Sequence, residues 1–310
     1  MMRVTGVSRR AALKRLAVAG ALAALGTHFA RAASAPLLQR KIPKTGELLP
    51  AVGLGTYRTF DVGASSTDRE SLKEVLQLFV RTGGKAVDSS PMYGRAEGVL
   101  GDLAVELGVT KSLFLATKVW TTGRDAGIRQ MEDSFRLLRT DRIDLMQVHN
   151  LLDLGTHMHT LREWKASGRI RYIGITHYHE GAYGELTRLL ATADYDFVQL
   201  NYSIAEREAE RAILPLAMER GVAVIVNRPF AQGELFTRVR DKPLPPWAEE
   251  IDCTSWAQLF LKYVLANPAV TCVIPATSKP KHLADNMGAG VGRLPDDAMR
   301  QRMVQLVASL

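Results

Sequence analysis

The stretch that decides the fold is residues 85–101, KAVDSSPMYGRAEGVLG. A short apolar run ends at Asp88, and the serines, proline and glycine that follow are typical of a turn. A helix is predicted to begin near Arg95. Asp88 and Tyr93 therefore stand at the carboxyl end of a predicted strand and in the loop beyond it, where parallel barrels carry their active sites. Taken alone, the same residues also fit a helix cap and a surface tyrosine.

The pattern of a short apolar run followed by a helical pattern repeats to the end of the chain. Helical spacing is found, for example, at 68–82, 125–138, 154–166 and 206–220. Before the first unit, 37–42 and 47–52 flank a Pro-Lys-Thr-Gly turn and predict a hairpin. The predicted strands lie at 52–55, 84–88, 112–118, 143–149, 170–175, 196–200, 222–226 and 270–274.

Continuous apolar strands need cover on both faces, so eight such units predict an α/β fold, a (β/α)8 TIM barrel with an N-terminal β-hairpin. A doubly wound open sheet is the alternative, but it is expected to carry Gly-x-Gly-x-x-Gly after its first strand. Residues 53–56, Gly-Leu-Gly-Thr, lack that spacing. A long segment at 229–252 predicts either a loop that folds over a ligand or a surface excursion.

Residues 1–32 have the composition of a signal peptide, with six basic residues and no acidic residue. The apolar run at 16–25 is too short to span a bilayer, so no stable membrane anchor is expected. Arg9 and Arg10, followed by Leu13 and Lys14, are typical of a twin-arginine signal. An ordinary secretory signal is the alternative. We expect cleavage before Ala33, a mature domain of 33–310, and export in the folded state to the periplasm by the twin-arginine export machinery.

The charge of the whole chain, +8, belongs largely to this leader. Its removal leaves 34 basic and 32 acidic residues, and no remaining block of like charge predicts a nucleic-acid surface. Cys253 and Cys272 could form one disulfide in an oxidising compartment, but two unpaired structural thiols are the preferred interpretation. The histidines and cysteines lack the spacing of metal ligands, so no metal site is expected.

Further polar residues close the third and fourth predicted strands. Lys118 ends the apolar run of the third, and a lysine there requires a carboxylate partner. His149 ends the fourth. Together with Asp88 and Tyr93, Lys118 and His149 make four polar groups of complementary chemistry at the same end of consecutive strands. A separate structural role for each residue explains this arrangement poorly.

In type and order, Asp88, Tyr93, Lys118 and His149 resemble the catalytic tetrad of the aldo-keto reductases, and the resemblance extends from residue 53 to residue 286. It implies reduction of a carbonyl by hydride transfer from a nicotinamide cofactor. Tyr93 would be the general acid, Lys118 would lower its pKa, Asp88 would hold Lys118, and His149 would orient the carbonyl.

The resemblance also implies a cofactor site along the later strand ends. Three of its residues depart from the family pattern: His177 replaces an asparagine, Asn227 an aromatic ring that stacks on the nicotinamide, and His282 an arginine. Lys279 and Lys281 favour NADPH over NADH. The expected cofactor contacts are Gly55, Thr56, Thr176, His177, Gln199, Asn227, Arg228, Pro229, Phe230, Ala276, Thr277, Ser278, Lys279, His282 and Asn286.

The predicted activity is therefore NADPH-dependent reduction of a small-molecule aldehyde or ketone. The alternatives are a cofactor-binding sensor or regulatory subunit and, less favoured, an unrelated barrel lyase or isomerase. Tyr57, Trp120 and Trp247 could line the substrate pocket, which would then suit an apolar or aromatic carbonyl, or each could equally be core or loop packing.

Overall fold

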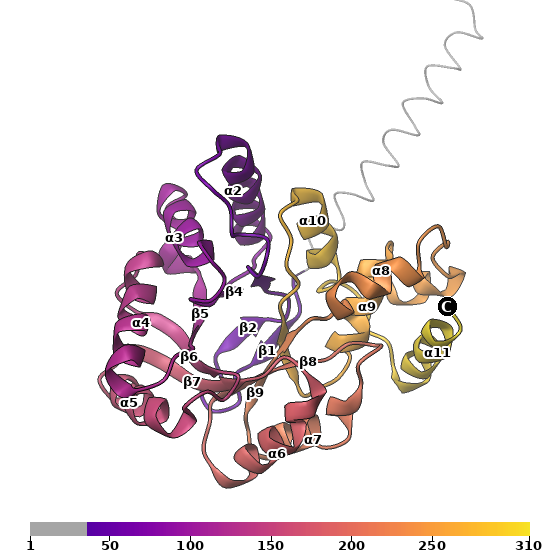
Figure 1. The fold of residues 1–310 in the computed structure, drawn as a ribbon. Helices are drawn as coiled ribbons and strands as arrows, with labels where there is room; N and C mark the ends of the chain where they lie inside the picture. The colour runs from indigo at the N-terminus through magenta and orange to yellow at the C-terminus, as the bar shows by residue number, and fades with distance from the viewer. Residues whose placement is uncertain (1–35) are drawn as a thin grey trace, which may run out of the picture. The chain divides into compact units, whose positions relative to one another are not determined.

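The apolar runs form eight parallel strands that close into a barrel (Figure 1). The computed structural model describes residues 36–310, so the predicted leader lies outside the described residues. Bridges from Val52 to Val273 and from Gly55 to Ala276 join the first strand to the last. The strands are β3 (Leu54–Gly55), β4 (Ala86–Asp88), β5 (Phe114–Val119), β6 (Ile143–His149), β7 (Ile170–Thr176), β8 (Phe197–Asn201), β9 (Ala223–Asn227) and β10 (Val270–Val273). The prediction of a (β/α)8 barrel is confirmed.

Helices surround the strands as an outer ring (Figure 1). The α-helices are α2 (Ser66–Arg81), α3 (Ala96–Glu106), α4 (Arg124–Leu137), α5 (Leu154–Ala166), α6 (Tyr183–Thr192), α7 (Ile213–Glu219), α8 (Glu234–Arg238), α9 (Trp256–Leu265), α10 (Pro280–Gly288) and α11 (Asp297–Ala308). Short 3₁₀ turns are η1 (Thr110–Ser112), η2 (Glu180–Ala182), η3 (Glu208–Glu210), η4 (Ala231–Gly233) and η5 (Pro246–Ile251).

The structure corrects two expectations about these helices. The single helix predicted at 206–220 is wrong, because η3 and α7 are separated at Ala212, where φ is −139° and ψ is −51°. Pro215 explains the break, since its ring would clash with the carbonyl of Arg211 in a continuous helix. The segment at 229–252 is not one irregular loop, because it contains η4, α8 and η5.

The predicted hairpin is also confirmed, as β1 (Gln39–Lys41) and β2 (Leu48–Pro50). Ile42 and Leu49 are fully buried and belong to the apolar cluster that fills the barrel interior. Polar contacts fix the hairpin there, since Arg171 of β7 bridges Glu47 and Asp144. The hairpin therefore closes the amino ends of the strands and leaves the carboxyl ends open.

Alternation along the strands divides the barrel interior into an apolar layer and a polar layer. Every second residue of a strand points inward, so on β5 Phe114 and Lys118 share the interior, while Thr117 faces the helices. The layer nearer the amino ends of the strands is apolar and includes Ala86, Phe114, Leu145, Tyr172, Phe197 and Ala223. Toward the carboxyl ends the interior is polar, with Asp88, Lys118, Gln147 and Gln199 all buried.

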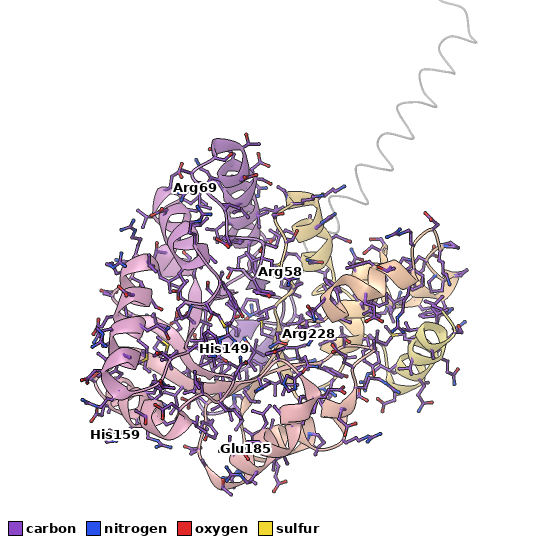
Figure 2. The ribbon with its side chains drawn as sticks, in the orientation of Figure 1. Arg58, Arg69, His149, His159, Glu185 and Arg228 are labelled. Atoms are coloured by element: carbon purple, nitrogen blue, oxygen red, sulfur yellow. The ribbon has the colours of Figure 1, made fainter. Side chains whose placement is uncertain are left out.

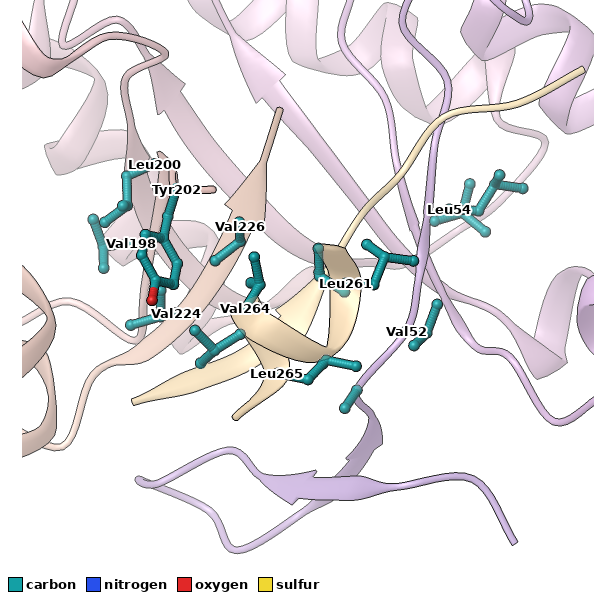
Figure 3. Close-up of a cluster of buried hydrophobic side chains, with 14 of the residues drawn as sticks. Val52, Leu54, Val198, Leu200, Tyr202, Val224, Val226, Leu261, Val264 and Leu265 are labelled. Carbon is teal, nitrogen blue, oxygen red and sulfur yellow. The ribbon is translucent and has the colours of Figure 1, made fainter. Parts of the chain in front are cut away.

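The outward-facing strand residues pack against the helices. Figure 3 shows Val198 and Leu200 of β8 and Val224 and Val226 of β9 in a buried cluster that includes Leu261, Val264 and Leu265 of α9. Full burial of one such side chain contributes about 1.5–3 kcal/mol. This packing makes the strands a rigid support for the side chains at their carboxyl ends.

Within residues 36–310, Cys253 and Cys272 are buried free thiols, as the preferred interpretation expected. In the same range, no helix is both long and apolar enough to cross a bilayer. The described residues also contain no group of three or more His, Cys, Asp or Glu side chains arranged to hold a metal ion.

Candidate active site

A cavity of about 660 Å³ opens at the carboxyl ends of the strands. Its wall includes Asp88, Tyr93 and His149, three of the four predicted catalytic residues. Figure 2 shows His149 and Arg228 toward the middle of the ring of helices, whereas His159 and Glu185 lie on outer helices. The volume is in the range of cavities that bind small molecules.

Lys118 and Asp88 form a buried ion pair at the base of this cavity. The Nζ atom of Lys118 donates to Asp88 Oδ2 at 2.7 Å and to the Ser89 carbonyl oxygen at 2.6 Å, and the lysine side chain has no exposed surface. Burial alone lowers the pKa of Lys118, but Asp88 and Tyr93 outweigh it and hold the pKa above its ordinary value. The predicted carboxylate partner is therefore Asp88, and Lys118 is charged.

Two glutamines that lie inside the barrel complete the surroundings of Asp88. Gln199 Nε2 donates to Asp88 Oδ1 at 2.8 Å, and Gln147 Nε2 lies 3.4 Å from the same oxygen. The sequence analysis expected Gln199 to contact the cofactor and overlooked Gln147. The alternation along β6 could have identified Gln147, because it lies two residues before His149 and so faces the same side of the strand.

Tyr93 reaches the cavity from the turn after β4. Gly94 has a φ of +62°, and a Cβ atom there would lie 2.4 Å from the Asp61 carboxyl group, so this turn requires glycine. Asp61 Oδ1 accepts a hydrogen bond from the Arg95 backbone N–H at 3.0 Å, which fixes the start of α3. The turn thus places the Tyr93 ring with its centroid 5.0 Å from Lys118 Nζ.

Two opposing effects set the protonation of Tyr93. Burial raises the pKa of its phenol, and the positive charge of Lys118 lowers it by less, so the pKa lies above its ordinary value. The contribution of Lys118 has the predicted sign, and burial of the phenol, which the sequence did not reveal, outweighs it. Tyr93 therefore holds its proton at neutral pH.

His149 faces Tyr93 across the cavity, with ring centroids 6.2 Å apart and planes at 82°. Burial, reinforced by the charges of Lys118 and His177, lowers the pKa of His149 to about 3. Ser90 Oγ lies 3.3 Å from His149 Nδ1, a contact that the sequence analysis missed. A neutral imidazole at this position can donate one N–H to a carbonyl oxygen.

A second buried carboxyl group lies behind Lys118, on the outer face of β5. Glu97 of α3 is 1% exposed and accepts hydrogen bonds from Thr117 Oγ1 at 2.5 Å and Ser134 Oγ at 3.2 Å. Burial raises the pKa of Glu97, and these hydrogen bonds only partly oppose it. Glu97 belongs to the helix layer and does not line the cavity.

The predicted cofactor contacts divide into two groups. The first lies on the cavity wall near the ends of β7 to β10 and consists of Thr176, Gln199, Asn227, Arg228, Pro229, Phe230 and Ala276. The second lies outside the wall and consists of Gly55, Thr56, His177, Thr277, Ser278, Lys279, His282 and Asn286.

Several residues of the second group have local roles. The Thr56 hydroxyl is buried and donates to the Asp88 carbonyl oxygen at 3.0 Å, so it braces the turn that carries Tyr93. His177 Nδ1 accepts a hydrogen bond from the Tyr178 backbone N–H at 3.0 Å. Thr277 Oγ1 accepts one from the Lys279 backbone N–H at 3.1 Å, which organises the entry to α10.

The wall fits a ligand that carries polar groups as well as an apolar ring. Among the described residues, Asn150 Oδ1 and Asn227 Oδ1 are buried without a hydrogen-bond partner, and both residues line the cavity. Buried acceptors of this kind require a donor, and a nicotinamide nucleotide carries amide and hydroxyl donors. The unpaired acceptors on the wall and the volume of the cavity are therefore compatible with the predicted cofactor.

The mouth of the cavity is aromatic. Tyr57 and Trp120 line it, and their side chains are 48% and 39% exposed. Trp247 follows the packing alternative, because the cavity wall does not include it and its ring lies 4.8 Å from the Arg302 guanidinium of α11. Other apolar residues of the wall were not among the expected site residues, for example Met92, Tyr178 and Phe236.

Comparison with known proteins agrees with this geometry. The family model described as "Aldo/keto reductase family" matches residues 51–303. The protein named Aldo-keto reductase YhdN of Bacillus subtilis is 26% identical over 65% of this chain and 64% of its own length. The protein named Methylglyoxal reductase YeaE of Escherichia coli is 27% identical over 80% of this chain and 88% of its own length.

Solved structures show the same fold. A Klebsiella pneumoniae aldo-keto reductase in complex with NADPH superimposes with a TM-score of 0.71 at 25% identity, over 88% of this chain and 95% of its own. Another structure from the same organism, in complex with NADP and acetate, gives a TM-score of 0.72 at 24% identity, over 87% and 96% of the two chains. The extent of the family match, together with the barrel and its strand-end residues, shows that this chain belongs to the aldo/keto reductase family of oxidoreductases.

Proposed function

We propose that this protein reduces an aldehyde or ketone to an alcohol with NADPH, and that Tyr93 is the general acid. The observation that carries the proposal is the arrangement of Tyr93, Lys118 and His149 around one cavity, with Asp88 paired to Lys118. Bound at this wall, a reduced nicotinamide supplies the hydride.

The side chains supply the rest of the chemistry. Hydride transfer leaves negative charge on the carbonyl oxygen, which needs electrostatic support and a proton. His149 is neutral and can orient the carbonyl by donating an N–H. Tyr93 holds its proton until that charge develops, and Lys118 then stabilises the phenolate. Asp88 keeps Lys118 charged and in place, so the ion pair supports the acid without touching the substrate.

The mouth of the cavity favours an apolar or aromatic carbonyl. Tyr57, Trp120 and Tyr178 are large side chains exposed at 48%, 39% and 49%, and an exposed apolar patch of this kind commonly marks a binding site. The names of relatives such as the methylglyoxal reductase of Escherichia coli make a small dicarbonyl the second substrate class to test.

The preference for NADPH over NADH rests on the segment that enters α10. Lys279 and Lys281 carry positive charge there, and no acidic residue lies between Ala276 and Asp285. Backbone N–H groups at a helix start favour anions, and a 2′-phosphate adds negative charge to the nucleotide. Comparing the Kd values of NADPH and NADH tests this preference, and equal affinities would contradict it.

A cofactor-binding sensor is the second candidate, because His177 and Asn227 depart from the family pattern while Tyr93 keeps a raised pKa. The full chain is mixed with NADPH and either 4-nitrobenzaldehyde or methylglyoxal, and nicotinamide absorbance is followed. Tyr93→Phe serves as the matched variant. We expect turnover in the parent only and nucleotide binding in both. Binding without turnover in either protein would favour the sensor.

We also propose that residues 1–32 direct export of the folded protein to the periplasm by the twin-arginine machinery. The support is the pair Arg9 and Arg10 before a weakly apolar run. Export of the folded protein would allow the nucleotide to be bound before translocation. Replacing both arginines with lysine should stop accumulation in the periplasm, whereas unchanged export would favour an ordinary secretory signal.

A further inference from the structure

Asn227 occupies the end of β9, where many aldo-keto reductases place an aromatic ring. Its backbone is the pairing partner of Asn201 on β8, and its side chain lines the cavity together with Thr176 and Gln199. Its Oδ1 atom is buried and accepts no hydrogen bond from residues 36–310. An unpartnered buried acceptor carries a desolvation cost that a ligand donor can remove.

The side chains that follow Asn227 are held by contacts within the protein. Arg228 donates to the Tyr178 carbonyl oxygen at 2.7 Å and to Glu206 at 3.1 Å, so its guanidinium is held by the protein. Phe230 packs on Phe236 with ring centroids 4.8 Å apart, and this pair belongs to the packing around α8.

Two of the expected cofactor contacts, Gln199 and Thr176, are already engaged with each other and with the ion pair. Gln199 Nε2 donates to Asp88 Oδ1 at 2.8 Å, and Gln199 Oε1 accepts from Thr176 Oγ1 at 3.0 Å. Both residues are only 1% exposed. Asn227, in contrast, has an acceptor on the cavity wall that no residue of the described chain uses.

We propose that Asn227 positions the nicotinamide by accepting a hydrogen bond from its carboxamide N–H₂ at Oδ1, in place of aromatic stacking. This inference rests on the proposed function, because it assumes that the cavity binds NADPH. Asn227 is then a cofactor-positioning residue, and its contribution is confined to the nicotinamide end of the nucleotide.

The test compares three ligands by isothermal titration calorimetry of the full chain. NADPH carries the carboxamide, its 3-acetylpyridine analogue replaces the N–H₂ with a methyl group, and 2′-phosphoadenosine diphosphate ribose lacks the ring. Asn227→Leu removes the acceptor at similar volume, and Asn227→Ala removes it with a smaller side chain. Asn150→Leu is the matched control, because Asn150 has the same unpartnered oxygen at the end of β6.

One neutral hydrogen bond corresponds to a roughly two- to tenfold change in Kd. The parent should therefore bind NADPH about two- to tenfold more tightly than the acetylpyridine analogue. Both Asn227 variants should lose that preference and keep the Kd of the ring-free ligand, whereas Asn150→Leu should retain the preference. Because the analogue is compared on the unaltered protein, the test does not depend on the folding of a variant.

Other outcomes would overturn the inference. Equal binding of NADPH and the analogue by the parent would exclude a carboxamide donor bond. An equal loss for all three ligands in the variants would mean that Asn227 only supports the wall, for example by pairing with Asn201 Nδ2, which is also buried and unpartnered. Loss of the preference in Asn150→Leu would contradict the assignment to Asn227. Failure of the parent to bind NADPH at all would overturn the proposed function as well.

Discussion

Lys118→Met tests the ion pair at the base of the cavity. Lys118 Nζ and Asp88 Oδ2 are 2.7 Å apart, and neither side chain is more than 4% exposed. At an effective dielectric constant of about 20, two unit charges at that distance attract by about 6 kcal/mol, and desolvation of both groups offsets much of this. Methionine leaves the Asp88 carboxylate buried without a cation, which typically costs about 3–5 kcal/mol of stability.

The cost should fall near the lower end of that range. Gln199 and Gln147 still face Asp88 Oδ1 in the variant, at 2.8 and 3.4 Å, so only Oδ2 loses its partner. We therefore expect Lys118→Met to lower the free energy of unfolding by about 3 kcal/mol. Adding Asp88→Asn removes the unpaired charge, and the amide can still accept from Gln199. The double variant should recover at least about 1 kcal/mol.

Urea denaturation at pH 7 measures both quantities, with circular dichroism as the probe and the midpoint compared at equal slope. Stability is the appropriate readout, because all of these variants are expected to lose carbonyl reduction. A loss below about 1 kcal/mol in Lys118→Met would refute the reasoning, since it would mean that Asp88 becomes protonated or hydrated at little cost. A double variant less stable than Lys118→Met would refute the charge argument specifically.

Two pH experiments test the protonation states of the site. The kcat/KM of the full chain for 4-nitrobenzaldehyde should vary less than about twofold between about pH 6 and 9. The reason is that His149 has a pKa of about 3 and Tyr93 has a raised pKa. A tenfold change in kcat/KM with a midpoint in that interval would contradict both assignments. The second experiment concerns Glu97. Because its pKa is raised, the folded state binds more protons than the unfolded state. The parent should therefore lose stability as the pH rises from the unfolded pKa of a glutamate, about 4.3, toward the folded pKa of Glu97. Glu97→Gln should lack this loss in urea denaturation at pH 4, 6 and 8, and parallel pH profiles of the two proteins would contradict a buried protonated carboxyl group.

Periodicity in the sequence was sufficient to predict the barrel and the location of its site. The continuous apolar runs of β5 and β6 imply that both faces of each strand are covered, so Lys118 and His149 were expected at buried strand ends, but the sequence does not show which face they occupy. The hairpin was predictable from its turn residues. The break at Ala212 was also accessible, since Pro215 cannot continue a helix that begins at 206.

The sequence could not reveal which polar groups pair with one another. Gln199 was expected to contact the cofactor, yet its amide is bound to Asp88, which lies 111 positions earlier. Trp247 could equally have lined the pocket, yet it packs on Arg302 of the last helix. Both contacts join distant parts of the chain, and residue type and spacing carry no information about them. The net direction of the Tyr93 pKa shift likewise depends on burial in three dimensions, which outweighs the neighbouring charge.

The position of Lys118 links the protonation states of the other residues. Its ammonium is paired with the Asp88 carboxylate, and the same positive charge adds to burial in keeping His149 neutral. The charge also opposes the rise in the pKa of Tyr93 without reversing it. In the proposed mechanism, the phenol therefore keeps its proton until negative charge develops beside it. A single paired cation beneath the cavity thus allows a neutral imidazole donor and a phenol proton donor to coexist at neutral pH. This arrangement is suited to carbonyl reduction, because the positive charge gains its full effect only as Tyr93 becomes phenolate.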